Sequence, residues 1–63
     1  MGYLDIVNEF DLVEDVIVQP DGLSIRVRGK KDGDFHDFYK TYQNKKTARC
    51  VFEKIKMFVG IPR

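Results

Sequence analysis

The chain has 63 residues, which is enough for one small domain and leaves little room for a deep enzymatic cleft beside the core. Its single cysteine excludes an internal disulfide framework, so the fold must rest on packing, and we expect a reducing, cytoplasmic setting. The N-terminus lacks the features of a signal peptide, and no apolar run approaches the roughly 20 residues that cross a bilayer.

The net charge of +1 conceals a strong asymmetry between the two parts of the chain. Residues 1–25 contain six acidic residues and no lysine or arginine, whereas residues 26–63 contain all eleven basic residues and four acidic ones. Such asymmetry indicates either a nucleic-acid-binding face or two halves that attract each other within the fold.

The first element predicted is a short helix over residues 3–11. Tyr3, Ile6, Val7 and Phe10 recur at the spacing that places side chains on one stripe of a helix. Asp5 lies in the first turn, where the helix dipole favours an acid.

Three strands are expected next, at residues 13–19, 23–28 and about 34–42. The first ends at a tight turn, Gln19 to Gly22, in which Pro20 and the glycine satisfy the φ angles that the turn requires. The second alternates strictly: one face carries Leu23, Ile25 and Val27, and the other carries Ser24, Arg26 and Arg28. A second turn at residues 29–33 leads into the third strand, and two short turns predict an antiparallel meander.

The last element predicted is a helix over residues 45–59. Asn44 is a suitable N-cap, and Gly60 followed by Ile61-Pro62 is a suitable stop. The apolar stripe of this helix consists of Ala48, Val51, Phe52, Ile55, Phe58 and Val59. The sequence therefore predicts an α+β domain of order α-β-β-β-α, a three-stranded antiparallel meander with the helices packed on one face.

A meander covered by helices on one side leaves its other face in water, and Arg26 and Arg28 belong to that face. Guanidinium groups match the geometry of phosphate and of the guanine edge. The competing interpretation is that the arginines only keep an open face soluble.

The facing of the third strand decides what lies beside these arginines. If Tyr39 and Tyr42 point inward around a bulge, then His36, Phe38 and Lys40 point outward, next to the arginines. Exposed rings could then stack on bases or press against sugars. In the alternative arrangement, Phe38 packs under the first helix.

The last helix carries a second group of candidate residues opposite its apolar stripe. Lys46, Arg49 and Glu53 lie there, together with Cys50 and Met57, which are seven residues apart. Two soft side chains on an exposed basic face suggest contact with a protein partner, and the competing interpretation is that they only form the rim of a broad stripe.

The residues expected of an enzyme or a metal site are missing. One histidine and one cysteine cannot supply a four-ligand zinc site, and Cys50 with His36 lacks a third group to orient the pair. The acids of the second turn do not have the spacing of a calcium loop, and no phosphate-binding glycine motif is present. We expect no catalysis, no cofactor and no metal.

Residues 22–55 resemble two families of DNA-binding domain, those of plant ethylene-response transcription factors and the arm-site-binding N-terminal domains of phage tyrosine integrases. The likeness rests on GLSIRVR, the turn KKDG, and FYKTYQNKKTARCVFE, with Thr41-Tyr42, the Asn44 cap, Ala48 and Phe52-Glu53 in matching places. The resemblance implies that the sheet reads the major groove, with contacts from Arg26, Arg28, His36 and Phe38. The first strand departs from these families, because it reads LVEDVIVQ where theirs is rich in arginine.

A looser likeness links the chain to double-stranded-RNA-binding domains. These have the same element order, and their second helix opens with a KKxAK motif, similar to Lys45-Lys46-Thr47-Ala48-Arg49 here. The resemblance implies that these lysines grip phosphates across a groove.

The sequence therefore predicts a small non-enzymatic binding module with no membrane or small-molecule partner. The preferred partner is nucleic acid, duplex DNA ahead of RNA, and the contact residues expected are Arg26, Arg28, His36, Phe38, Lys40, Lys45, Lys46 and Arg49. The alternative is an inhibitor or adaptor of viral or mobile-element type that binds a host protein through Phe38, Cys50 and Met57.

Overall fold

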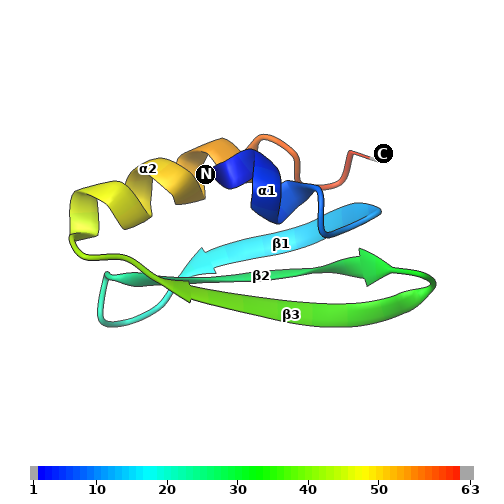
Figure 1. The fold of residues 1–63 in the computed structure, drawn as a ribbon, viewed down its shortest axis with the longest axis horizontal. Helices are drawn as coiled ribbons and strands as arrows, with labels where there is room; N and C mark the ends of the chain where they lie inside the picture. Colours follow the sequence, from blue (N-terminus) through cyan, green and yellow to red (C-terminus); the bar gives the residue numbers. More distant parts are fainter. Residues whose placement is uncertain (1, 62–63) are drawn as a thin grey trace.

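The computed structural model describes residues 2–61. Its elements in chain order are α1 (Tyr3–Val7), β1 (Leu12–Val18), β2 (Ser24–Lys31), β3 (Asp34–Thr41) and α2 (Lys45–Lys56). The strands form one antiparallel sheet in the order β1-β2-β3, and both helices lie on the same side of it (Figure 1). The α+β class and the α-β-β-β-α order are therefore confirmed.

The turn between β2 and β3 is tighter than predicted. Gly29 to Lys31 belong to β2, so only Asp32 and Gly33 form the loop, with φ angles of 54° and 86°. Positive φ at both central residues is the mark of a type I′ turn, and Asp-Gly is one of its preferred pairs. This turn sets a register between β2 and β3 that continues without interruption from Lys31↔Asp34 to Ser24↔Thr41.

The turn between β1 and β2 forms where the sequence predicts it. The Gly22 N–H donates to the Gln19 carbonyl at 2.9 Å, and Gly22 has a φ of 73°. One Asp21 carboxylate oxygen accepts hydrogen bonds from the Leu23 and Ser24 N–H groups at 2.9 and 3.0 Å. These donors stabilise the ionised carboxylate, so the pKa of Asp21 lies below its ordinary value.

The core lies between the helices and the inner face of the sheet. It consists of Ile6, Val7, Phe10, Val13, Val16, Ile25, Val27 and Ile55. Helix α1 ends at Val7, earlier than expected, because the Glu9 and Phe10 N–H groups bond three residues back, to Ile6 and Val7. The Phe10 side chain is nevertheless buried, since the turn still directs it into the core.

Helix α2 begins where predicted, but it ends at Lys56 rather than at residue 59, because the Met57 and Phe58 N–H groups bond three residues back, to Lys54 and Ile55. The Asn44 side chain accepts a hydrogen bond from the Thr47 N–H at 2.8 Å, and Gly60 beyond the helix has a φ of 78°. The chain after the helix then meets the sheet, where Val59 bridges to Val13 and the Gly60 N–H donates to the Val13 carbonyl at 2.9 Å. The outer edge of β1 is therefore partly covered by the segment that follows α2.

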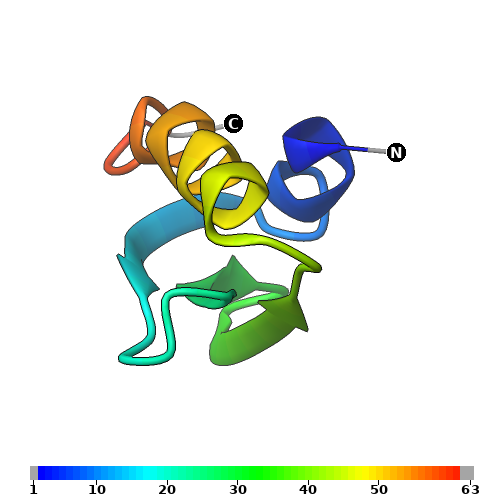
Figure 2. The ribbon, with the colours of Figure 1, turned by 90° about the vertical axis from the view of Figure 1, so that its left-hand side faces the viewer.

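The helical layer does not cover the three strands equally. Helix α2 packs on β1 and β2, whereas neither helix packs closely on β3. In the end-on view the two helices lie side by side above the sheet, α2 on the side of β1 and α1 on the side of β3 (Figure 2). Within residues 2–61, no helix is long and apolar enough to span a membrane.

Candidate functional site

The face of the sheet away from the helices carries the two arginines, as the alternation of β2 predicts. Arg28 lies opposite Asp37 on β3, and its Nη1 is 3.2 Å from Asp37 Oδ1. Its Nε is 3.5 Å from Glu14 Oε1 on β1, and its guanidinium carbon is 4.9 Å from the centre of the Phe35 ring. Arg28 is thus held between two carboxylates and against a ring, and its charge is compensated within the fold.

Within residues 2–61, the neighbouring arginine has no carboxylate partner. Arg26 lies between Ile17 of β1 and Tyr39 of β3, which are its partners in the two ladders. It makes no ion pair within the described chain, and its Nε is shielded from solvent without a hydrogen-bond acceptor. The open face therefore has two neighbouring rows across the strands. In one, Arg28 lies between carboxylates, and in the other, Arg26 lies between Ile17 and Tyr39.

The predicted outward position of His36, Phe38 and Lys40 is wrong. Residues directly opposite in an antiparallel pair lie on the same face, and these three lie opposite Gly29, Val27 and Ile25 on the helix side. The expected bulge is not in β3 but in β1, between Val13 and Asp15, so the parity of β3 never shifts. The rings beside the arginines are instead those of Phe35 and Tyr39, which are 46% and 60% exposed.

The basic residues predicted to bind nucleic acid are divided among three places. Arg26 and Arg28 lie on the open face, and Lys40 lies on the helix side of β3 with its Nζ 5.6 Å from the Tyr42 ring centre. The remaining three, Lys45, Lys46 and Arg49, lie on the exposed first half of α2, in the other layer. The structure therefore does not bring the eight predicted residues together on one surface.

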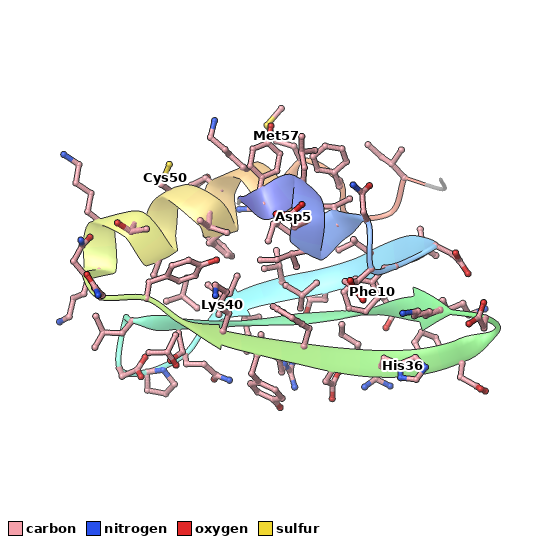
Figure 3. The ribbon with its side chains drawn as sticks, viewed as in Figure 1. Asp5, Phe10, His36, Lys40, Cys50 and Met57 are labelled. Carbon is pink, nitrogen blue, oxygen red and sulfur yellow. The ribbon has the colours of Figure 1, made fainter. Side chains whose placement is uncertain are left out.

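The alternative protein-binding set is also divided. Cys50 and Met57 are exposed and project from α2 away from the sheet (Figure 3), and Met57 is 74% exposed. Phe38 lies on the opposite side of the helical layer, half-buried against the core.

A groove that the sequence does not predict runs between α1 and β3. Its deeper part has a volume of about 270 Å³ and a mainly apolar floor formed by Ile6, Phe38, Tyr42 and Val51. The acids Asp5 and Glu9 rim it on the α1 side, and Lys40 rims it on the β3 side. Asp5 and Lys40 are seen on either side of it in Figure 3.

The groove continues past Phe38 toward the β2–β3 turn. A second hollow of about 310 Å³ shares Phe38 and Glu9 with the first and extends to His36 and Lys31. Glu9 also pairs with Lys31, its Oε1 lying 3.4 Å from Lys31 Nζ. Partial burial beside the first hollow raises the pKa of Tyr42 above its ordinary value, because the phenolate would be poorly solvated there.

Strand β3 has an edge with no partner strand within residues 2–61. The Tyr42 N–H donates to the Leu23 carbonyl at 2.8 Å, which fixes the alternation of the ladder. Since bonded and non-bonded pairs alternate in an antiparallel ladder, the even-numbered residues of β3 bond to β2. The backbone groups that point to the free edge are therefore those of Phe35, Asp37, Tyr39 and Thr41.

The comparisons with known proteins assign no family. No family model, no curated protein and no solved structure matches the chain. In the described part of the chain, no group of three or more histidine, cysteine or acidic side chains is placed to hold a metal ion.

Proposed function

We propose that the chain is a small non-enzymatic binding module that docks onto another protein through β3. The observation that carries the proposal is that β3 combines an edge that is unpaired within residues 2–61 with aromatic side chains on both of its faces. Phe35 and Tyr39 project from the open face beside Arg28 and Arg26, and Phe38 forms the floor of the groove on the other side. Tyrosine, phenylalanine and arginine are the residue types enriched at the centre of protein interfaces.

The charges of the open face favour a protein over a nucleic acid. Glu14 and Asp37 both contact Arg28, and Asp15 lies opposite it in the β1–β2 ladder. Phosphates approaching this face would meet carboxylates as well as guanidinium groups, and the carboxylates would repel them. A protein surface with mixed charge and exposed rings has no such penalty.

The proposal is tested by a comparison of two double variants as bait for proteins from cells that carry the gene. Phe35→Ser/Tyr39→Ser removes the exposed rings of β3, and Cys50→Ser/Met57→Ser is the matched control on the outer face of α2. We expect the parent and the α2 variant to retain the same protein in moderate salt and after nuclease treatment, and the β3 variant to lose it. Loss with the α2 variant alone, or retention that disappears with nuclease, would contradict the proposal.

A second candidate function is binding of duplex DNA by the same face, and one observation favours it. Arg26, Arg28 and Lys30 project from the open face as a continuous basic row along β2. If this row reads DNA, Arg28→Glu abolishes a gel shift with duplex DNA, Lys30→Glu weakens it mildly, and affinity falls about tenfold or more between low and moderate salt. A variant Arg28→Glu that binds DNA like the parent excludes this face as the DNA surface.

A further inference from the structure

We infer that β3 and the groove beside it take an extended peptide segment of the partner, which adds to the sheet as a fourth strand and places one apolar side chain, flanked by a basic one, under α1. The inference rests on the proposed function and specifies the class of partner. Three independent features of the described residues support it: the backbone of the edge, the shape of the groove and the charge of its rim.

The backbone of β3 is suited to pair with a further strand. The N–H and C=O groups of Phe35, Asp37, Tyr39 and Thr41 point to the free edge, as the alternation of the ladder requires. The opposite edge of the sheet is less accessible, because Val59 and Gly60 pair with Val13 there. Strand addition is a common mode of peptide recognition, in which backbone bonds supply affinity and side-chain pockets supply specificity.

The groove lies where alternate side chains of an added strand would project. A fourth strand continues the sheet, so every second side chain of the peptide faces the helical layer, as Phe38 and Lys40 do in β3. The hollow of about 270 Å³ over Ile6, Phe38 and Val51 lies on that side. An apolar cavity of roughly 150 Å³ accommodates a benzene-sized group, so the hollow has room for a leucine or phenylalanine side chain.

The rim of the groove selects the charge of the occupant. Asp5 in α1 and Glu9 just after it line the first hollow together with one cation, Lys40. Lys31, which pairs with Glu9, lines the second hollow together with Asp32 and Asp37, so acids outnumber cations in both parts of the groove. A lysine or arginine two residues from the apolar side chain of the peptide would lie on the same side of the added strand and meet this acidic rim.

The same charges disfavour a second copy of the chain as the occupant. If two β3 strands paired about a two-fold axis, both α1 helices would lie on the same side of the joined sheet and face each other across it. Each copy would bring two carboxylates, those of Asp5 and Glu9, and one cation, Lys40, to the shared groove, so the carboxylates would outnumber the cations and repel one another. A foreign segment with basic residues meets no such repulsion.

The test uses the whole chain, labelled with nitrogen-15, and the synthetic peptide acetyl-Thr-Lys-Thr-Leu-Thr-Lys-Thr-amide. Lysine on both sides of leucine places one ammonium near Glu9 in either strand direction. We expect saturable changes in the NMR chemical shifts of the Ile6 and Val51 amides as the peptide is added. We also expect slower hydrogen exchange at the Asp37, Tyr39 and Thr41 amides. Replacing the peptide's leucine by alanine should weaken binding by about tenfold, and replacing its lysines by aspartates should do so at least as strongly.

Two variants of one residue separate the backbone from the side chain. Tyr39→Pro removes an N–H that points to the free edge and leaves the ladder to β2 intact, and proline is tolerated at such edge positions. We expect it to keep the slow exchange of the Phe38 and Lys40 amides while it weakens peptide binding about tenfold. Tyr39→Ala, which retains the N–H, should bind the peptide nearly as well as the parent.

Each other outcome overturns a defined part of the inference. Chemical-shift changes at the groove residues without slower exchange at the odd-numbered amides of β3 would mean that the peptide binds in the groove without pairing to β3. The protein-binding proposal would then stand without strand addition. No saturable shift at millimolar peptide would refute the stated chemistry of the occupant, while the bait experiment on Phe35 and Tyr39 still decides the proposed function. Slow exchange at Asp37 and Tyr39 in the free protein that is lost on dilution would identify a second copy as the occupant.

Discussion

The ring of Phe10 packs over Gly29, so a side chain introduced at position 29 tests how closely the ring and the sheet are packed. A Cβ at position 29 would lie 2.7 and 2.9 Å from Phe10 Cδ1 and Cγ, and would also collide with the Leu12 carbonyl oxygen. Gly29 is itself buried, and the carbonyl is part of the backbone and cannot rotate away. Gly29→Ala therefore forces either the ring or β1 to move.

The expected loss of stability follows from two opposing effects. Replacing glycine by alanine at a site without strain stabilises a protein by about 0.4–1 kcal/mol, because the unfolded chain loses freedom. Overpacking in a well-filled core costs about 1–3 kcal/mol, and a contact with backbone belongs at the upper end of that range. We expect a net loss of about 1–2 kcal/mol, out of a total near 3–9 kcal/mol for a domain of this size.

The assay is urea unfolding followed by circular dichroism, with a double-mutant cycle as the control. Phe10→Ala removes the ring and with it the collision. The stability lost by the double variant Phe10→Ala/Gly29→Ala should therefore be smaller than the sum of the two single losses, by at least about 0.5 kcal/mol. A Gly29→Ala protein as stable as the parent, or strict additivity in the cycle, would show that the ring does not lie over Gly29.

Three further predictions concern single residues outside the groove. The N–H groups of Leu23 and Ser24 lower the pKa of Asp21 in the folded protein, so just below pH 3.8 the unfolded state binds more protons than the folded state. The stability that Asp21 contributes is therefore present above that pH and is lost as the pH falls through the folded pKa. The free energy of unfolding, measured as the pH is lowered, should fall less steeply for Asp21→Asn than for the parent. The exposed Cys50 should react with a thiol reagent in the native protein as fast as after denaturant is added, and a protected thiol would contradict its placement on the outer face of α2. Asn44→Ala should lower the free energy of unfolding by about 1 kcal/mol, measured in urea, and an unchanged midpoint would mean that the cap contributes nothing.

Much of the fold could be predicted because local chemistry specifies it. The alternation of Ile25 and Val27 with Arg26 and Arg28 assigns the two faces of β2, and the structure buries the first pair while it exposes the second in part. The Asn44 cap likewise specifies where α2 begins. In such cases one short stretch contains both partners of the interaction, so no knowledge of the tertiary structure is required.

The facing of β3 can be predicted from one local signal, the pair Asp32-Gly33. Asp32-Gly33 is a preferred pair for a two-residue hairpin loop, and such a loop places Lys31 opposite Asp34. Counting back from this pair puts Phe38 opposite Val27, on the helix side. The loop of five residues that the sequence analysis predicts does not fix this register, so it leaves both facings of the strand open.

The groove could not be predicted, because it depends on how far two helices reach across three strands. Helix α1 has only five residues, and α2 packs on β1 and β2, so neither covers β3. One feature of the sequence is consistent with this arrangement: on the helix side β3 presents His36, Phe38 and Lys40, a single apolar residue between two polar ones. A strand buried under a helix would require an apolar residue at each of these positions.

The most direct test of the account is the hydrogen exchange of the β3 amides in the free protein, measured residue by residue by NMR. We predict slow exchange at His36, Phe38 and Lys40, whose N–H groups bond to β2, and fast exchange at Asp37, Tyr39 and Thr41, whose N–H groups face the free edge. The reverse pattern would place Phe38 on the open face of the sheet, and the groove and the edge proposed for binding would then not exist as described.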